Sequence, residues 1–213
     1  VKDKIEEVLQ ITSVKAKSVN VVYNPLDIDA IKKKSDEYKP DINQNYIVSV
    51  GRITPNKNIS FLLESYKYAR DKYHLTLPLV LVGDGHDMHN IRLKIKEFNL
   101  EPYIITLGLL DNPYPWIKNA SLLTSTSFAE GFGMVLVEAL ACDTKIISTK
   151  SKGGVSDIMT GSLENYLVDF NIEEFAQKMV ATIDEKKEWN FEKYIQKFQP
   201  ATIVKQYKEL YVH

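Results

Sequence analysis

The chain has 213 residues, of which 44% are hydrophobic and 26% charged, as is usual for a globular protein. A formal net charge of −1 and scattered lysines argue against nucleic-acid binding, and no apolar run reaches the ~20 residues that a membrane-spanning helix needs. The single cysteine, Cys142, rules out an internal disulfide and predicts a small buried hydrophobe in a reducing compartment, which favours a cytoplasmic protein.

Residues 1–18 are interpreted as the remnant of a preceding domain or as a linker helix. They have neither an initiating Met nor the pattern of a signal peptide, so we expect a piece of a longer protein. Residues 19–23 form a β-branched run that predicts a strand, which Asn24-Pro25 would stop. Residues 32–45 are rich in lysine and aspartate and predict an exposed helix end and a loop.

From residue 46 onward, short strands alternate with amphipathic helices. Apolar runs predict strands at 46–50, 79–82, 104–107, 122–125, 145–148 and 166–168. Apolar residues at helical spacing predict helices over 61–73, 88–98, 134–142 and 172–183. Unbroken apolar strands, each followed by a helix, predict a parallel sheet covered on both faces, which is a doubly wound, Rossmann-like α/β domain. We place this domain at residues 19–190 and a C-terminal helix at residues 191–213.

Polar and glycine-rich segments follow the predicted strands at their carboxyl ends, where ligands bind in such folds. These segments are Gly51-Arg52, Gly83-Asp84-Gly85, Gly108, residues 125–133 and residues 151–154. We interpret Gly83-Asp84-Gly85 as a tight turn between a strand and a helix. Gly153-Gly154 fits a backbone nest for anions and a plain turn equally well.

Residues 127–141 carry the strongest signal, because a glycine-rich turn opens a helix and two glutamates stand eight residues apart, at Glu130 and Glu138. Free backbone N–H groups at a helix N-terminus can receive phosphate. Glu138 is the only charged residue in an apolar helix, which we expect to be buried nearly all round, so its carboxylate needs a partner. Hydroxyls such as a ribose diol are one candidate, and a polar stripe facing solvent is the alternative.

Arg52 and Lys57 place two cations on one loop between a strand end and a helix start. Arg can bind phosphate oxygens through two parallel hydrogen bonds, while Lys supplies a compact charge. As isolated loop residues they would be solvated, but their position on the same sheet edge as the glycine-rich turn favours phosphate binding. His86 and His89 are not expected to bind a metal, because the sequence offers no third ligand nearby.

Together these segments resemble the C-terminal, donor-binding domain of the family 4 retaining glycosyltransferases, which have the two-domain GT-B fold. The resemblance covers roughly residues 19–185, and the matching segments occur in the family's order: residues 24–27, 51–57, 83–85, 107–108, 130–138 and 153–154. The segment 130–138, with its internal Gly-Phe-Gly, is the most specific. Residues 142–144 depart from the small-x-Gly-x-Pro stretch that is common there, and Asp157 stands where a glutamate is usual, so Asp157 is given no role.

The resemblance implies roles for individual residues. Arg52 and Lys57 would bind the donor diphosphate and offset charge on the leaving nucleotide, and Glu130 would contact hydroxyls of the donor sugar, so these three are the candidate catalytic residues. Glu138 would bind the ribose diol. The other implied donor-binding residues lie at strand ends and around the helix start: Gly51, Gly83, Leu107, Leu109, Leu110, Gly131, Phe132, Gly133, Met134 and Val135. The backbone N–H groups of the last three would hold the distal phosphate, and the base would pack beside residues 107–110.

The implied function is a retaining hexosyltransferase that needs neither metal nor cofactor. It would move a sugar from a nucleotide-sugar, UDP-sugar before GDP-sugar, to a glycan or lipid-linked acceptor in polysaccharide or lipopolysaccharide biosynthesis. Its other implied partner is an N-terminal acceptor domain that this chain lacks, so we expect the chain alone to be inactive. The alternatives are a non-catalytic nucleotide-sugar-binding module and another GT-B enzyme, such as a sugar-nucleotide epimerase.

We expect weak self-association through the ends of the chain, and the inner face of the membrane is the alternative to a purely cytoplasmic location of the parent enzyme. The C-terminal stretch has an apolar stripe at Ile203, Tyr207, Leu210 and Tyr211, and Ile5, Val8 and Leu9 lie near the other end. Without a covering domain these side chains must stay partly exposed, fold onto their own domain or meet a second copy.

Overall fold

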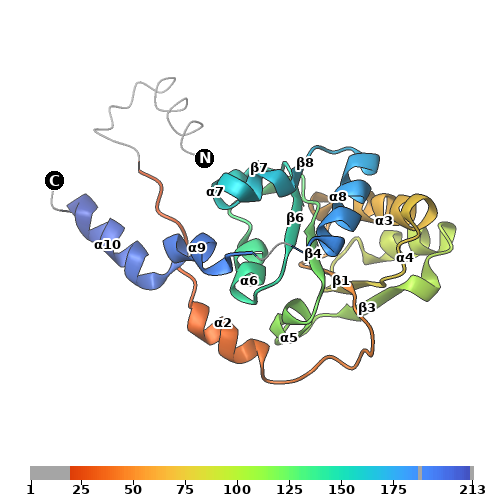
Figure 1. Cartoon of the computed structure of the whole chain (residues 1–213), viewed down its shortest axis with the longest axis horizontal. Helices are drawn as coiled ribbons and strands as arrows, with labels where there is room; N and C mark the ends of the chain where they lie inside the picture. The colour runs from red at the N-terminus through yellow and green to blue at the C-terminus, as the bar shows by residue number, and fades with distance from the viewer. Residues whose placement is uncertain (1–19, 187–188, 212–213) are drawn as a thin grey trace. The chain divides into compact units, whose positions relative to one another are not determined.

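The computed structural model describes residues 20–186 and 189–211. The chain divides into two compact units, one formed by residues 28–195 and the other by residues 1–27 with 196–213. The larger unit is a three-layer α/β domain built around a six-stranded parallel sheet (Figure 1). This confirms the doubly wound α/β fold that the alternation of strands and helices predicts.

The sheet has the strand order β3-β2-β1-β4-β6-β8. Its strands are β1 Ile47–Val50, β2 Leu79–Val82, β3 Ile104–Gly108, β4 Leu122–Ser125, β6 Ile146–Thr149 and β8 Leu167–Val168. In the central pairings Ile47 lies opposite both Leu79 and Leu122. Successive strands run outward from β1 in one direction and from β4 in the other, so the topological switch point lies between β1 and β4, where folds of this type bind ligands.

Helices cover both faces of the sheet (Figure 1). On one face α3 packs against α4 and α8, and on the other α6 packs against α2, α5 and α9. The bounds are α2 Ile28–Ser35, α3 Ile59–Tyr73, α4 Met88–Glu97, α5 Tyr114–Lys118, α6 Met134–Ala141, α7 Val155–Ile158, α8 Ile172–Asp184 and α9 Phe191–Ile195. Short 3-10 turns are η1 Pro55–Lys57, η2 Glu101–Tyr103 and η3 Gly161–Tyr166.

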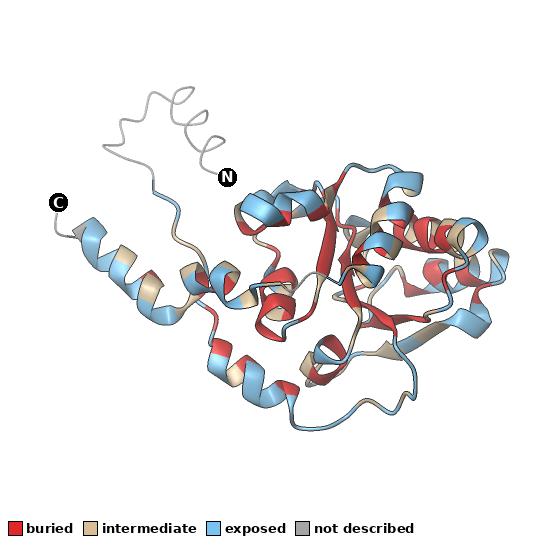
Figure 2. Cartoon of the chain, in the orientation of Figure 1, coloured by how far each residue is buried: buried red, intermediate tan, exposed pale blue. Residues whose placement is uncertain are grey.

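The core lies between the sheet and its two helical layers (Figure 2). Strands β2 and β4 are buried along their whole length, which explains why their sequences are continuous apolar runs rather than alternating ones. Tyr46, directly before β1, is buried, and its hydroxyl donates a hydrogen bond to the carbonyl of Trp116 at 2.8 Å. Asn171 caps α8, because its side chain accepts a hydrogen bond from the backbone N–H of Glu174.

The strand predicted at residues 19–23 is wrong for residues 20–23, and Val19 lies outside the described residues. Residues 20–27 have no regular secondary structure. Within the smaller unit this segment is held by η4 Gln196–Phe198 instead: the ring of Tyr23 meets that of Phe198 edge-on at 5.5 Å, and the N–H of Leu26 donates to the carbonyl of Phe198. A β-branched run becomes a strand only where a sheet edge pairs with it.

The smaller unit also holds α10, which spans Pro200–Tyr211. Ile203 of the expected apolar stripe is buried, whereas Tyr207 and Leu210 are exposed, and the side chain of Tyr211 lies outside the described residues. The apolar positions expected within residues 1–18 lie outside the described residues as well.

Among the helices of the described ranges, none combines the length and the apolar character that crossing a membrane requires.

Candidate functional site

Glycines at the ends of β1, β2 and β3 let three strand termini converge. The N–H of Gly51 donates to the carbonyl of Val82, and the N–H of Gly83 donates to that of Gly108. Gly83 has a φ of +124°, and a Cβ there would lie 2.0 Å from the carbonyl oxygen of Gly51, so only glycine fits. The observed role of Gly83 is therefore to bring the loop after β1 close to the end of β2.

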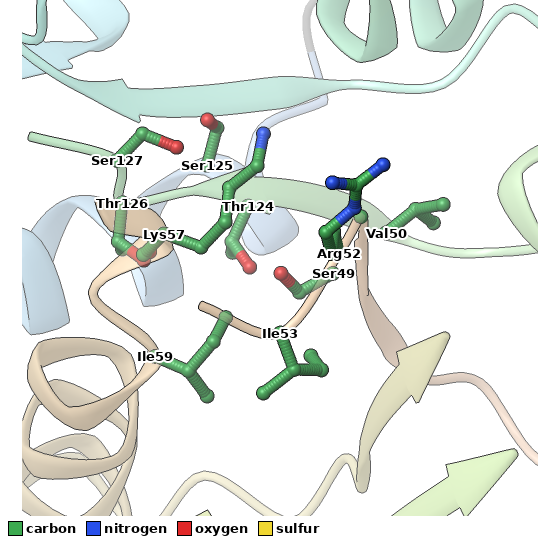
Figure 3. Close-up of a pocket in the computed structure, with 11 residues that line it drawn as sticks. Ser49, Val50, Arg52, Ile53, Lys57, Ile59, Thr124, Ser125, Thr126 and Ser127 are labelled. Carbon is green, nitrogen blue, oxygen red and sulfur yellow. The ribbon is translucent and has the colours of Figure 1, made fainter. Parts of the chain in front are cut away.

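A small pocket lies at the carboxyl ends of β1 and β4, the switch point of the sheet (Figure 3). Its enclosed volume of about 10 Å³ suffices for a single water molecule, so the groups at its mouth rather than its depth define the site. The lining residues are Ser49, Val50, Gly51, Arg52, Ile53, Lys57, Ile59, Thr124, Ser125, Thr126 and Ser127. Figure 3 shows the side chains of Arg52 and Lys57 extending in the same direction from the loop after β1.

Lys57 is joined to Glu130 by an ion pair at the mouth of this pocket. Its Nζ lies 2.5 Å from Oε1 of Glu130, and the two side chains are 25% and 14% exposed. The hydroxyl of Ser127 donates to the same oxygen at 2.6 Å. Both bonds fall on Oε1, so among the described residues the second carboxylate oxygen, Oε2, stays available to a ligand. Arg52, by contrast, is exposed.

Backbone and side-chain hydrogen bonds fix the two segments that carry this ion pair. Asn56 donates from Nδ2 to the carbonyl of Ala129 at 2.8 Å, and its own carbonyl accepts from the N–H of Phe128 at 2.8 Å. The hydroxyl of Thr126 donates to the carbonyl of Lys57 at 3.0 Å. The η1 turn is therefore clamped to the segment after β4, which places the cation beside the carboxylate before any ligand arrives.

A second, two-stranded sheet supports Glu130. Its strands β5 Ala129–Glu130 and β7 Lys152–Gly153 pair in parallel, and the sequence analysis missed both because two residues are too short to form a pattern. A Cβ on Gly153 would lie 2.1 Å from the carbonyl oxygen of Glu130, and the N–H of Gly154 donates to that oxygen at 3.0 Å. The N–H of Gly154 is thus already bonded, so the anion-nest interpretation of this glycine pair is wrong there.

Gly133 begins α6 with a left-handed φ of +94°. The first N–H groups of such a helix, here around Met134 and Val135, have no partner within it and carry the positive end of the helix dipole. Leu136, Val137 and residues 139–141 are buried, but Met134 is 45% exposed and Val135 is half-buried. The expectation of a helix buried nearly all round is therefore wrong for the first turn, which lies at the surface after exposed Gly131 and half-buried Phe132.

Glu138 is half-buried on α6, and its hydrogen-bond partner is the hydroxyl of Tyr114, which donates to Oε1 at 3.3 Å. Burial raises the pKa of the Glu138 carboxyl, and the bond from Tyr114 lowers it. The pKa of Tyr114 is raised to about 12, first by burial and then by the Glu138 charge, so its hydroxyl stays a donor at neutral pH. The sequence analysis did not single out Tyr114. The pattern that could have drawn attention to it is the Asn-Pro-Tyr-Pro turn, residues 112–115, after β3.

The expected site residues fall into three groups in the structure. Gly51, Arg52 and Lys57 share the pocket, and Glu130 joins them through its ion pair. Gly131 to Val135 and Glu138 lie before and along α6, and no hydrogen bond of the described residues joins Glu138 to the pocket. Leu107 and Leu110 are half-buried and Leu109 is 82% exposed at the end of β3. Asp157 is half-buried in α7.

In the described part of the chain, no three His, Cys, Asp or Glu side chains gather in an arrangement that could hold a metal ion. His86 and His89 are both exposed.

The fold, a doubly wound sheet with a pocket at its switch point, is that of one GT-B domain. Residues 29–198 match the family model of "Glycosyl transferases group 1", and the chain belongs to this family. This match confirms the resemblance to the donor-binding domain of family 4 glycosyltransferases.

Two curated relatives illustrate the family. The N-acetylgalactosamine-N,N'-diacetylbacillosaminyl-diphospho-undecaprenol 4-alpha-N-acetylgalactosaminyltransferase of Campylobacter jejuni is 32% identical over 172 residues, which are 81% of this chain and 46% of the relative. The N-acetyl-alpha-D-glucosaminyl L-malate synthase of Bacillus anthracis is 25% identical over 207 residues, 92% of this chain and 54% of the relative. The chain spans about half the length of these relatives.

Among solved structures, the Anabaena protein HepE in complex with UDP superimposes with a TM-score of 0.81 at 20% identity, covering 99% of this chain and 62% of that one. The galactosyltransferase WaaB of the lipopolysaccharide outer core gives a TM-score of 0.75 at 23% identity, covering 97% and 59%. At these identities the likeness concerns the fold.

Proposed function

We propose that this chain is the donor-binding half of a retaining, metal-independent glycosyltransferase that takes its sugar from a UDP-sugar. One observation carries the proposal: the pocket at the switch point presents Arg52 and Lys57 together, with Lys57 paired to Glu130. Two cations and a carboxylate are the groups that a negatively charged diphosphate linked to a neutral, hydroxyl-rich sugar requires.

In this proposal the cations act on the leaving group. When the bond between the sugar and the diphosphate breaks, negative charge grows on the bridging phosphate oxygen, and positive groups held in place beforehand stabilise that charge most effectively. Arg52 and Lys57 supply positive charge through their side chains, and the N-terminus of α6 adds the equivalent of about +0.5 elementary charge. These groups take the part that a divalent cation plays in metal-dependent enzymes, so the proposed reaction needs no metal and no cofactor.

Glu130 and Glu138 take the hydroxyl-binding roles. Oε2 of Glu130 would accept a hydrogen bond from a hydroxyl of the donor sugar, while Oε1 keeps its bonds to Lys57 and Ser127. Glu138, held by Tyr114, would accept the ribose diol, and the base would pack beside residues 107–110. The retaining outcome is proposed to arise from attack on the face from which the nucleotide departs, without an enzyme nucleophile.

The relatives support the choice of donor and acceptor class. The Campylobacter protein is named as an N-acetylgalactosaminyltransferase acting on a diphospho-undecaprenol compound, and HepE was crystallised with UDP. We therefore propose a hexose or N-acetylhexosamine as the sugar, a glycan or lipid-linked saccharide as the acceptor, and a preceding acceptor-binding domain in the parent enzyme.

Calorimetric titration of the chain with UDP, GDP and ADP, with and without EDTA, tests the proposal. We expect UDP to bind most tightly and EDTA to leave its affinity unchanged. Lys94→Ala is the matched control for a Lys57→Ala variant, because Lys94 also forms a half-buried ion pair, with Glu64, on helices away from the pocket. A strict requirement for Mg²⁺ or Mn²⁺, or equal UDP affinity in both variants, would contradict the proposed site.

A further inference from the structure

Tyr114 connects two parts of the proposed site that lie apart in the sequence. It is the first residue of α5, four residues after Leu110. Its hydroxyl crosses to α6 and donates to Oε1 of Glu138 at 3.3 Å. A residue that follows the loop proposed to receive the base thus contacts, through its side chain, the carboxylate proposed to receive the ribose.

The backbone of Tyr114 is itself fixed by hydrogen bonds that do not involve Glu138. Its N–H donates to Oδ1 of Asn112 at 3.1 Å, and Nδ2 of Asn112 donates to the carbonyl of Lys34 at 2.9 Å. The hydroxyl of Tyr38 donates to the carbonyl of Asn112 at 2.6 Å. Because these bonds tie the backbone at Tyr114 to α2 and to the segment after it, the point from which the tyrosine ring extends is set without Glu138, and the hydroxyl can impose an orientation on the carboxylate.

Phenylalanine would fill the same space as Tyr114, so the hydroxyl needs its own explanation. A half-buried carboxylate without a donor is costly, and one bond to Oε1 also fixes the direction in which Oε2 points. We infer that Tyr114 is a positioning residue for the donor: it holds Glu138 ionised and oriented so that Oε2 accepts the ribose hydroxyls. This inference rests on the proposed function and adds to it a residue that touches no reacting atom.

Among the groups around Glu138, Tyr114 is the one whose hydrogen bond lowers the pKa of its carboxyl. Helix α6 packs against α2, α5 and α9. The titratable groups on and beside these helices are Asp29, Lys32, Lys33, Lys34, Asp36, Glu37, Lys118, Cys142, Asp143, Glu192, Lys193 and Tyr194. In the described part of the chain, burial and the bond from Tyr114 are the two causes acting on the pKa of Glu138: burial raises it and Tyr114 lowers it.

Removing the Tyr114 hydroxyl leaves burial unopposed, so the pKa of Glu138 rises further and the carboxylate takes up a proton at a higher pH. A protonated Glu138 accepts fewer hydrogen bonds from ribose hydroxyls. The affinity lost in Tyr114→Phe should therefore grow as the pH falls, whereas a purely structural loss would be the same at every pH.

The test is the ratio of UDP dissociation constants of Tyr114→Phe and the unchanged chain, measured by calorimetry between about pH 5 and 8, which cancels the titration of the nucleotide itself. We expect a ratio of about three near pH 8 that rises to about ten near pH 5.5, because the Glu138 carboxyl of the variant takes up its proton at a higher pH. Tyr166→Phe is the matched control, because its hydroxyl donates to Oε2 of Glu185 at 2.7 Å in a similar pair on η3; its ratio should stay near one.

Further variants separate this inference from the proposed function. In a Glu138→Gln background, Tyr114→Phe should have no pH-dependent effect, because the titrating group is gone. The unchanged chain should also bind 2′,3′-dideoxy-UDP more weakly than UDP. If it shows that preference but the Tyr114→Phe ratio is flat across the pH range, the inference about Tyr114 is overturned alone. If both nucleotides bind equally, the ribose role of Glu138 is wrong and the inference fails with it.

Discussion

Lys57 and Glu130 face each other across 2.5 Å, one on the η1 turn and the other on β5. The pairing has a chemical consequence for the proposed ligand. Before a donor arrives, the lysine is neutralised and held by the same carboxylate that would contact the sugar. A bare diphosphate must share Lys57 with Glu130, whereas a nucleotide-sugar also brings hydroxyls that can bond to the carboxylate. We therefore expect the pair to favour the complete donor over the free nucleotide.

Glu130→Gln should strengthen UDP binding by about three- to tenfold, equal to about 0.7–1.4 kcal/mol, because it removes a negative charge beside the phosphates and releases Lys57. The same change should weaken the preference for a UDP-sugar over UDP, since an amide has only one acceptor oxygen and Oε1 already takes two bonds. Calorimetry with both ligands measures the two effects. Glu64→Gln, which removes the partner of Lys94, should change neither.

Weaker UDP binding in Glu130→Gln would contradict this prediction. It would mean that the carboxylate serves chiefly to hold Lys57 in place, so that the cation loses more by becoming mobile than it gains by losing its counter-charge.

Lys57→Ala and Arg52→Ala should each weaken UDP binding by about 1.5–3 kcal/mol, the range for a charge-assisted hydrogen bond. The two variants should differ in their effect on the fold. Lys57→Ala should lower thermal stability, because Lys57 is partly buried against Glu130 and its loss leaves that carboxylate with fewer donors. Arg52 is exposed, so Arg52→Ala should leave thermal stability unchanged. Arg52→Lys should restore only part of the affinity if the contact is bidentate. Unchanged UDP affinity in both alanine variants would contradict the role of these residues in binding the diphosphate.

How much of this could be read from the sequence depends on the range of the interactions. The six main strands were predictable because each contains an apolar run, although β3 and β8 are less buried than the strands between them. Arg52, Lys57 and Glu130 were predicted as site residues from motif and position. The pairing of Lys57 with Glu130 spans 73 residues, and that of Tyr114 with Glu138 spans 24, so neither follows from local patterns. At residues 20–23 the local pattern predicts a strand that does not form, because their β propensity finds no neighbouring strand to pair with.

The glycines of the site should differ sharply in what they tolerate. Gly83→Ala and Gly153→Ala place a Cβ 2.0 and 2.1 Å from a carbonyl oxygen at positive φ, so each should cost about 3 kcal/mol or more of the free energy of unfolding. Gly131→Ala is the matched control, because a Cβ there meets nothing within 4 Å. Thermal unfolding of the three variants measures the difference. Equal melting temperatures for Gly83→Ala and Gly131→Ala would show that the strand ends approach less closely than described.

Glu138→Gln should separate stability from binding. Burial raises the pKa of Glu138 in the folded chain above its unfolded value, so the folded state holds this proton more tightly. A group of this kind lowers the free energy of unfolding as the pH rises from the unfolded pKa through the folded one, and the penalty is fully present above that window. Glutamine keeps an acceptor for the Tyr114 hydroxyl and carries no charge, so the variant should be at least as stable as the unchanged chain at neutral pH.

The advantage of Glu138→Gln should shrink as the pH falls below the folded pKa, because the unchanged chain is then neutral at this position too. UDP affinity should move the opposite way and fall by about 1–2 kcal/mol at neutral pH, since the amide offers the ribose hydroxyls a weaker and uncharged acceptor. Melting curves and calorimetry at two pH values test both halves. A variant that loses stability at neutral pH while binding UDP normally would assign Glu138 to the fold instead of the ligand.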